Sequence, residues 1–414
     1  MGANLRSHVI ISAILSVIVM VGGFIYIGYS AFSYGVDKLN APTADNSVFA
    51  TNDPNSLVEK IDVYAPDKQA AAENYLLVGI DSRDGDNSTV GGNNGDASAV
   101  TGSRSDTIMV AHMSADKKRV SVINFPRDLS VTRPECEAWD GKQYTDEVIP
   151  GESGVKLNSV FATGGARCLV RTITALTGFQ LTHYAGVDFS GFSSIVDSVG
   201  GVEVCTEYPL VDGELGTILP NAGSTTLKGE DALRYVRARK IPEEGMGDYS
   251  RIHRQQAFLS SLMNTALDKA SDPAALVGMA KTMIQYSFGE NITVESILRT
   301  SKALSAMDRD DVVFMTVPTL GTDDSGNETP DMEGIQTMMK ALINDDLKGL
   351  EALNSASRKI DTKQGQDATK APEKRDDAPK TTASKPNAPA PSTVNKNSLN
   401  NGVNITGKTG GLCE

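Results

Sequence analysis

The sequence predicts an α/β fold in which helices flank a central, mixed and twisted sheet as an α-β-α sandwich; an α+β sandwich around one sheet is the alternative. The first observation behind this prediction is that strand-like and helix-like segments alternate from Glu73 to about Leu350. The second is that a predicted hairpin stands beside strands that are separated by helices, which indicates a mixed sheet. The apolar fraction of 40% is sufficient for a buried core.

The N-terminal residues are predicted to anchor the chain in a membrane. No charged residue lies between Arg6 and Asp37, and the apolar run from Val9 to Ile27 is long enough to cross the hydrocarbon core of a bilayer. A cleaved signal peptide is the alternative, although this run is longer than the apolar region of a typical signal peptide. Arg6 and His8 favour a cytoplasmic N-terminus. We expect a cytoplasmic tail over residues 1–8, a transmembrane helix over 9–31, and a stalk or linker with a short helix over 32–72.

The elements of the expected folded domain, residues 73–350, follow in order. The run "NYLLVGID" is an apolar strand that ends at Asp81, and a loop rich in Gly, Asn, Ser and Asp covers residues 84–103. The β-branched runs "TIMVAHMS" and "RVSVINFP" are joined by "ADKK", which predicts a hairpin. The segment "GGARCLVRTITALTG" has helical spacing and a glycine stop. Beyond it, "HYAGVDFSGFSSIVDSVGGVEVC" predicts strand, helix, glycine turn and strand, "SRIHRQQAFLSSLMNTALDKA" an amphipathic helix, and "DVVFMTVPT" another strand.

The composition changes after about residue 350. Residues 351–402 are rich in Pro, Ala, Lys, Asp and Thr and contain no aromatic residue. Such a segment cannot bury a core, so we expect a disordered linker or tether there. Residues 403–414 form a short C-terminal stub.

Charge and cysteine usage narrow the class of protein. A net charge of −13 argues against a nucleic-acid partner, which would require a basic face. Arginine dominates the basic residues between positions 83 and 254, and arginine suits planar, bidentate anion recognition. The four cysteines lack zinc-binding spacing. An even number in an exported domain suggests disulfides, with three pairings open and buried free thiols as the alternative. The cysteines are Cys136, Cys168, Cys205 and Cys413.

The predicted hairpin brings charged residues together at one end of the sheet. If its strands pair antiparallel across "ADKK", paired residue numbers sum to roughly 232–233. Asp106 then lies opposite Pro126 or Arg127. In the same register Arg104 lies near Asp128, and Asp81 ends a neighbouring strand. Ligand sites in open α/β sheets favour such strand ends; the alternative is an ordinary salt-bridge network that closes a surface hairpin.

The residue types at this strand end favour a site for a metal and a diphosphate. Two aspartates without histidine or cysteine suit a hard cation such as Mg²⁺, with Mn²⁺ as the alternative, and Mg²⁺ commonly binds substrate phosphates. Arginines around such an ion suit a diphosphate. The motifs GxGxxG, GxxxxGK[ST] and GxSxG are absent from the sequence, and the four histidines lack metal-ligand spacing.

A second arginine cluster lies downstream, in "GEDALRYVRARK" and "GDYSRIHRQQ". It gathers cations with few nearby acids, an arrangement that a bound anion would stabilise. If residues 235–239 are extended, Arg237 and Arg239 point to the same face. The alternative is a basic surface strand.

Taken together and in order, these motifs resemble the LytR-CpsA-Psr family. The motifs are "LLVGIDSR", "RSDTIMV", "INFPRD", "KLNSVFATGG", "VGGVEV", "LKGEDALRYVRARK" and "GDYSRIHRQQ". The resemblance covers about residues 74–270, with weaker support to about 350. It implies an enzyme that transfers a glycopolymer, arabinogalactan or teichoic-acid-like, from a polyprenyl-diphosphate carrier to peptidoglycan with the help of Mg²⁺. It also implies a hydrophobic tunnel for the prenyl chain and a catalytic domain outside the cell membrane.

The resemblance further implies roles for individual residues. Asp81 and Asp106 correspond to metal ligands, and either Asp81 or Asp248 is a candidate base for the acceptor hydroxyl. The residues implied to bind the diphosphate or to line its pocket are Arg83, Arg104, Arg127, Arg237, Arg239, Arg254 and Gln255. The implied catalytic residues are Asp81, Arg104, Arg127, Arg237, Arg239 and Asp248.

The sequence departs from the family in its cysteines. Ser224 stands where actinobacterial relatives often carry a cysteine, which leaves Cys205 without its expected partner. With that departure, the expected pairs are Cys136–Cys168 and Cys205–Cys413. Two other functions stay open: a polyprenyl-diphosphate hydrolase, which transfers to water, and a non-catalytic protein that binds lipid-linked polymer or acts as a transcriptional attenuator.

Overall fold

The computed structural model describes most of the expected folded domain. The described residues are 47–49, 58–81, 104–140, 143–244, 248–269, scattered residues between 272 and 286, 287–292, 294–308, 311–346 and 405–406. The predicted transmembrane helix, most of the stalk, the loop over 84–103 and the linker over 351–402 lie outside them. Within the described ranges, no helix is long and apolar enough to cross a membrane.

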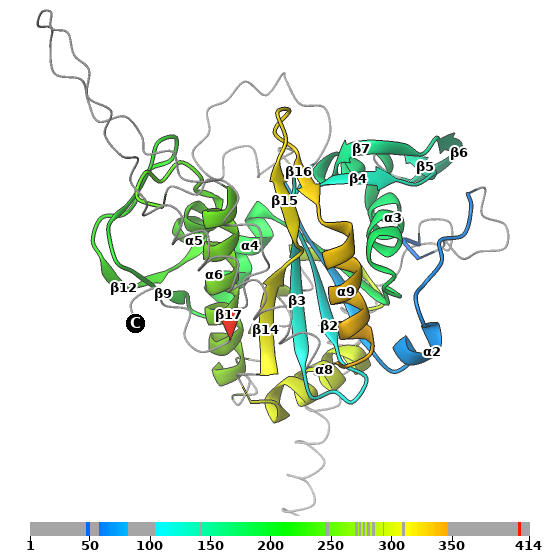
Figure 1. The fold of residues 1–414 in the computed structure, drawn as a ribbon. Coiled ribbons are helices and arrows are strands. Elements are labelled where there is room, and N and C mark those ends of the chain that lie inside the picture. Colours follow the sequence, from blue (N-terminus) through cyan, green and yellow to red (C-terminus); the bar gives the residue numbers. More distant parts are fainter. Residues whose placement is uncertain are drawn as a thin grey trace, which may run out of the picture.

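A seven-stranded mixed sheet forms the centre of the fold, with the strand order β13-β8-β1-β2-β3-β14-β17 (Figure 1). β1 pairs parallel with β8 and β3 pairs parallel with β14, whereas the other neighbours pair antiparallel. This confirms the predicted α/β class with a central mixed sheet. The strands are Glu73–Asp81 (β1), Arg104–Met113 (β2), Val120–Phe125 (β3), His183–Asp188 (β8), Ser287–Glu290 (β13), Val312–Thr316 (β14) and Ile405–Thr406 (β17).

The β2–β3 hairpin forms in the predicted register. Ile108 pairs with Phe125 and Val110 with Ile123, and the residue numbers of every pair sum to 233. The apolar alternation of the two strands sets this register. A slip by one residue would turn the buried side chains of Ile108, Val110 and Ile123 toward the wrong face of the sheet.

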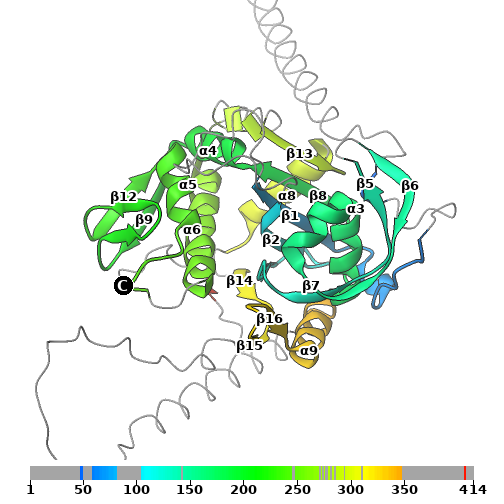
Figure 2. The same ribbon diagram turned by 90° about the horizontal axis from the view of Figure 1, so that it is seen from above.

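Helices cover both faces of the sheet, as Figures 1 and 2 show from two directions. The main core lies between the sheet and helices α3 and α9, around Leu76 and Ile123. On the opposite face, α6 and α8 pack against Val120 and Phe314. A further core joins α4, α5 and α6. The helices are Pro66–Gln69 (α2), Leu157–Thr177 (α3), Phe189–Ser198 (α4), Gly229–Arg237 (α5), Asp248–Lys269 (α6), Val294–Ala306 (α8) and Met332–Ile343 (α9).

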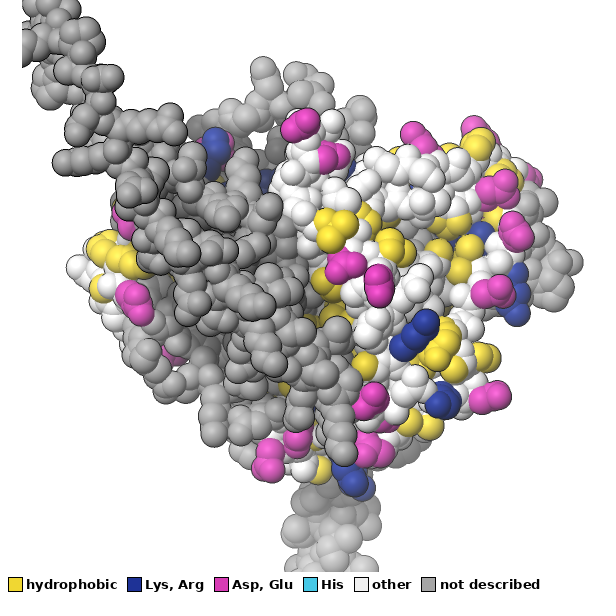
Figure 3. All heavy atoms as spheres, in the orientation of Figure 1, with side chains coloured by type: hydrophobic (Ala, Val, Ile, Leu, Met, Phe, Trp, Pro, Cys, Tyr) yellow, Lys and Arg dark blue, Asp and Glu magenta, His cyan; other side chains and the backbone are white. Residues whose placement is uncertain are grey.

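Two-stranded ribbons surround this sandwich. They are β4 (Ser130–Arg133) with β7 (Glu152–Lys156), β5 (Cys136–Trp139) with β6 (Tyr144–Ile149), β10 (Leu210–Asp212) with β11 (Gly216–Leu219), β12 (Gly223–Leu227) with β9 (Val202–Thr206), and β15 (Thr319–Thr322) with β16 (Glu328–Pro330). Over α9 and the β15–β16 ribbon, Figure 3 shows acidic, basic and apolar side chains interspersed on the surface. That face has the mixed character of an ordinary solvated surface.

A disulfide joins the β5–β6 ribbon to α3. It links Cys136 to Cys168 with an S–S distance of 1.97 Å, which confirms the expected pair. α3 departs from helical geometry at Gly164 and Gly165, beside this bond. A Cβ atom at Gly164 would lie 2.6 Å from the Cβ atom of Cys168, so glycine is needed for the close approach.

The second expected disulfide is described only in part. Cys205 is disulfide-bonded. Its expected partner, Cys413, lies outside the described residues, and that pairing stays a prediction.

Candidate active site

Part of the predicted convergence of charged residues is seen at the end of the β2–β3 hairpin, where the side chains of Asp106 and Arg127 meet. Arg127 donates from Nη1 to Oδ1 of Asp106 over 2.8 Å, and the Asp106 side chain is 23% exposed. The Nε atom of Arg127 also lies 3.3 Å from Oδ2 of Asp128. The register of the hairpin thus places the carboxylate of "RSD" against the guanidinium of "PRD".

β1 adds a second aspartate position to this strand end. Asp81 pairs with Arg104 in the register of β1 with β2, and Asp188 at the end of β8 pairs with Ile80. The carboxyl ends of β1, β3 and β8 therefore lie along one edge, where ligand sites of α/β sheets are found. The side chains of Asp81 and Arg104, and Arg83 as a whole, lie outside the described part of the structure.

Arg239 reaches the Asp106 carboxylate from a different element. Its Nη2 atom lies 3.6 Å from Oδ2 of Asp106, and its side chain is 34% exposed. Arg237, the last residue of α5, lies with its guanidinium carbon 4.2 Å from the centroid of the Phe189 ring. Because Phe189 directly follows β8, both arginines are brought toward the same strand ends.

The condition that residues 235–239 are extended is not met in the first part of this segment. α5 runs from Gly229 to Arg237, and the chain becomes extended only at Ala238, with φ −55° and ψ 139°. Acidic residues lie in the first turn of α5 and basic residues in its last turn, an order that the helix dipole favours. Ala232 and Val236 are buried at helical spacing. Local helix signals therefore outweighed the alternation of arginines.

Arg254 and Gln255 lie behind the segment that carries the two arginines. Both are buried, and both donate to backbone oxygen atoms of that segment. The acceptors are Tyr235 and Ala238 for Arg254 and Val236 for Gln255. The Nε atom of Arg254 also lies 3.3 Å from Oε1 of Glu244. These contacts hold the backbone in place, while the implied contact of Arg254 and Gln255 with substrate stays a prediction.

α6 contributes a cation that the sequence reasoning did not select. Arg251 is buried, and its charge acts on the Asp106 carboxylate. A signal was present in "SRIHRQQ", where Arg251 and Arg254 lie about one helical turn apart, but only Arg254 was assigned to the pocket. Asp248 begins α6, and its side chain lies outside the described part of the structure.

The surroundings of Asp106 keep its side chain ionised. Burial alone would raise the pKa of this carboxyl group. The positive charges of Arg127 and Arg239, the hydrogen bond from Arg127 and the charge of Arg251 outweigh burial, so the pKa lies below the ordinary value of 3.8. Asp106 is therefore a carboxylate at neutral pH, suited to balance cations rather than to donate a proton.

The backbone beside Arg127 is fixed by neighbouring elements. In the first turn of α3, the amide of Asn158 donates to the carbonyl of Arg127 over 2.9 Å, and the amide of Glu328 in β16 donates to that of Asp128 over 2.9 Å. Lys156 lies 3.1 Å from the Asp128 carboxylate. Because amides at a helix start need acceptors from outside the helix, the docking of α3 positions the arginine.

The described side chains include one of the two implied metal ligands, Asp106. Groups of three or more His, Cys, Asp or Glu side chains that could hold a metal are absent from the described residues. Mg²⁺ does not require such a group, since one or two carboxylates together with phosphate oxygens and water commonly hold it. The ionised Asp106, with Asp81 on the adjacent strand, fits an ion that binds together with an anionic ligand.

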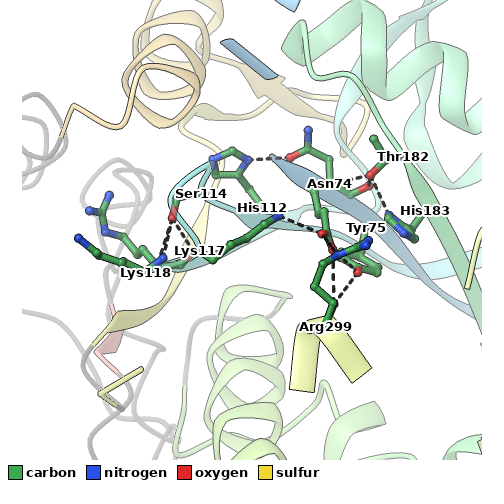
Figure 4. A network of polar contacts seen from close by, with 12 residues as sticks. Asn74, Tyr75, His112, Ser114, Lys117, Lys118, Thr182, His183 and Arg299 are labelled. Atoms are coloured by element: carbon green, nitrogen blue, oxygen red, sulfur yellow. Dashed lines mark hydrogen bonds and ion pairs between the residues drawn. The ribbon is translucent and has the colours of Figure 1, made fainter. Parts of the chain in front are cut away.

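A second polar network lies at the opposite end of the sheet (Figure 4). Glu73, at the start of β1, accepts hydrogen bonds from Lys117 over 2.9 Å, from Arg299 over 2.7 Å and from the Tyr75 hydroxyl over 2.7 Å. Burial alone would raise the pKa of Glu73, but these hydrogen bonds outweigh it and lower the pKa to about 2. The network ties β1 to the β2–β3 turn and to α8.

Two histidines of the same region are neutral at neutral pH. Burial lowers the pKa of His112 and of His183 to about 4. His112 contacts Asn74, with 2.7 Å between Nδ1 and Oδ1, and the ring of His183 stacks on that of Tyr75 with 4.1 Å between the ring centroids. His112 is buried in β2, in keeping with the prediction that it belongs to the strand rather than to a catalytic site.

A mixed sheet covered by helices, with an ionised aspartate among arginines at its strand ends, places the chain in the α/β class. Residues 33–344 match the LytR_cpsA_psr family. The chain belongs to this family.

Individual relatives share parts of this sequence and fold. The chain is 32% identical over 255 residues to "Probable cell wall biosynthesis protein LcpB" of Corynebacterium glutamicum, covering 60% of this chain and 55% of that protein. It is 26% identical over 264 residues to the polyisoprenyl-teichoic acid–peptidoglycan teichoic acid transferase TagU of Oceanobacillus iheyensis, covering 62% of this chain and 69% of that protein. The solved structure of protein gbs0355 from Streptococcus agalactiae aligns with a TM-score of 0.50 and 17% identity, over 67% of this chain and 89% of that one, which shows a shared fold. The chain spans little more than half the length of LcpB.

Proposed function

We propose that this protein transfers a glycopolymer from a polyprenyl-diphosphate carrier to peptidoglycan. The observation that carries the proposal is the Asp106 carboxylate, on which the charges of Arg127, Arg239 and Arg251 act together. Three cations around one carboxylate suit a ligand with adjacent negative phosphates. The relative TagU is named as a teichoic acid transferase, which supports the same class of reaction.

In the proposed reaction, an oxygen atom of an acceptor hydroxyl attacks the phosphorus atom that carries the polymer. The new P–O bond forms as the bond from that phosphorus to the bridging oxygen breaks, and polyprenyl monophosphate leaves with the electron pair. Arg127 and Arg239 stabilise the negative charge that develops on the phosphate oxygens. The hydroxyl proton passes to a base, for which Asp81 and Asp248 are the candidates.

Asp106 and Asp81 are the residues that would hold Mg²⁺, or Mn²⁺ in its place. When bound, the ion would neutralise negative charge on the diphosphate. The low pKa of Asp106, which burial opposes and the neighbouring arginines impose, supports this role because metal ligands must be deprotonated.

We also propose that the catalytic domain lies outside the cell membrane, held by the span over residues 9–31, and that a hydrophobic tunnel receives the prenyl chain. The Cys136–Cys168 disulfide supports an oxidising compartment. The apolar length of the predicted span supports the anchor.

The test is a transfer assay with the full chain in detergent or membranes. Lipid-linked glycopolymer and Mg²⁺ are supplied with and without peptidoglycan, and covalent attachment is measured. We expect attachment that depends on the acceptor, and a loss of at least about a hundredfold in rate for the Arg237→Ala/Arg239→Ala double variant. The matched control is Lys118→Ala, at an exposed cation of the β2–β3 turn, which we expect to retain full activity.

Each alternative gives a different result in this assay. Release of polymer at the same rate without peptidoglycan would identify a hydrolase. Binding of the lipid-linked polymer by the wild type with no turnover would identify a binding protein. Full activity of the double variant would contradict the assignment of the arginines.

A further inference from the structure

A buried aspartate outside the charged cluster holds the backbone of Arg239. Asp212, the last residue of β10, is 3% exposed. Its Oδ2 atom accepts hydrogen bonds from the backbone amides of Arg239 and Lys240, each over 2.7 Å. Its Oδ1 atom accepts from the amides of Glu214 and Leu215, each over 2.8 Å. One carboxylate oxygen atom therefore accepts hydrogen bonds from the segment after α5, and the other accepts hydrogen bonds from the β10–β11 turn.

The four amides make this carboxylate a fixed acceptor. Burial alone would raise the pKa of Asp212, but the hydrogen bonds from the four backbone amides outweigh burial and lower the pKa. An aspartate held in this way stays ionised at neutral pH. At neutral pH it therefore keeps its hydrogen bonds to the segment that carries Arg239.

Further donors hold the same segment through its carbonyl oxygen atoms. The amide of Gly213 donates to the carbonyl of Lys240 over 2.9 Å. Arg254 and Gln255 donate to carbonyls earlier in the segment. With the backbone held through both its amides and its carbonyl groups, the side chain of Arg239 is the part left to order, which reduces the entropy lost when that residue binds an anion.

We propose that Asp212 is a positioning residue that directs Arg239 toward Asp106 and the bound diphosphate. The identity of the ligand rests on the proposed function, whereas the contact between Asp212 and the segment does not. The competing explanation is that Asp212 only shapes the β10–β11 turn. The two roles belong to different oxygen atoms of one carboxylate, so a substitution can separate them.

Asp212→Asn is the substitution that separates the two roles. Asparagine keeps one acceptor oxygen atom and replaces the other with an amide donor. The amides of Glu214 and Leu215 in the turn can still donate to the remaining oxygen atom, as in other turns in which an asparagine side chain accepts from the backbone. The amide group then faces the amides of Arg239 and Lys240 and cannot accept from them. Glu214→Gln is the matched control. It removes a negative charge two positions after Asp212, and that charge belongs to an exposed ion pair with Lys240.

The experiment uses the full chain, with inorganic pyrophosphate and Mg²⁺ as the probe. Binding is measured by calorimetry for the wild type, Asp212→Asn, Arg239→Ala and the double variant. We expect Asp212→Asn to weaken binding by roughly tenfold and to have no further effect in the Arg239→Ala background, since both changes remove one interaction. The Glu214→Gln variant should bind like the wild type.

Hydrogen exchange provides a readout that needs no ligand. Peptides that cover residues 238–240 should exchange faster in Asp212→Asn, and peptides from α3 should not change. Additive losses of binding in the double variant, or unchanged exchange at residues 238–240, would overturn the positioning role. If the wild type binds no pyrophosphate, the proposed function is overturned. The exchange data would still show whether Asp212 holds the backbone of residues 238–240. If Asp212→Asn does not fold, Asp212→Ser takes its place with the same expectations, because its hydroxyl can still serve the turn.

Discussion

Two carboxylates at opposite ends of the central sheet each form ion pairs with two cationic side chains, and the geometry of the two clusters differs. Glu73 accepts close hydrogen bonds from both of its cations, over 2.9 Å from Lys117 and 2.7 Å from Arg299, and its side chain is 9% exposed. Asp106 accepts one close hydrogen bond, over 2.8 Å from Arg127, while Arg239 stays 3.6 Å away.

The difference supports the proposal that the Asp106 end of the sheet receives the ligand. At Glu73, the two cations and the Tyr75 hydroxyl all converge on one carboxylate and fasten β1 to its neighbours. At Asp106, the longer contact to a partly exposed Arg239 leaves this guanidinium able to bind an additional acceptor. Because clustered cations repel one another, a bound anion would stabilise the cluster around Asp106 more than the cluster around Glu73.

The largest expected effect comes from removing the central carboxylate of the site. Asp106→Asn should reduce the rate of transfer by at least about a hundredfold, because it removes an implied metal ligand. Binding of pyrophosphate without Mg²⁺ should not weaken, since Arg127 and Arg239 lose their competing partner. Transfer assays and calorimetry measure the two quantities. Asp116→Asn, at an exposed aspartate in the turn of the same hairpin, is the control, and an Asp106→Asn variant with normal transfer would remove this residue from the mechanism.

A paired substitution tests the comparison directly. Arg239→Ala should lower kcat/KM about tenfold to a hundredfold with little change in urea stability, because this side chain makes one long ion pair. Arg299→Ala should leave kcat/KM unchanged and lower the free energy of unfolding by about 1 kcal/mol, a value reduced by the partial exposure of this arginine. The reverse pattern, with activity lost at Arg299 and stability lost at Arg239, would show that the two ends have been assigned the wrong way round.

The Glu73 end should show a pH-dependent loss of stability. The three hydrogen bonds offset burial and lower the pKa of Glu73 from 4.5 to about 2. Because the folded-state pKa is depressed, the stabilisation is fully present above pH 4.5 and is lost as the pH falls toward 2. The free energy of unfolding of the wild type should exceed that of Glu73→Gln by about 2 kcal/mol at pH 7, and the gap should close on acidification. Comparing the two proteins cancels the contribution of His112, but not that of His183, on which the charge of Glu73 acts. A gap that is independent of pH would show that the hydrogen bonds do not act through the charge.

Much of the site could be predicted where it depends on strand pairing. The contact between Asp106 and Arg127 followed from the length of one turn and the apolar alternation of two strands. The position of Asp81 beside this hairpin followed from its place at the end of an apolar strand. These inferences succeed because each residue in a hairpin has a defined partner once the turn is located.

The contributions of the helices could not be predicted in the same way. Alternating arginines suggested a strand near Arg237, whereas the segment up to that residue is helical. Arg251 lay in a recognised motif, but nothing local showed that its charge acts on Asp106. The role of Asp212 in holding the segment of Arg239 was also invisible, since the two residues are brought together by packing across 27 positions of sequence.

By itself, the sequence determined most strands of the central sheet, the hairpin register and the ordered motifs that placed the chain in its family, because short-range periodicity and turn residues specify them. Only the tertiary structure decided that Arg239 and Arg251 join Arg127 around Asp106. It also decided that Asp212 and Arg254 form hydrogen bonds with the backbone of the segment that carries Arg239. The physical reason is that the docking of α5 and α6 depends on many side-chain contacts between segments far apart in the chain. Local sequence patterns do not specify these long-range contacts.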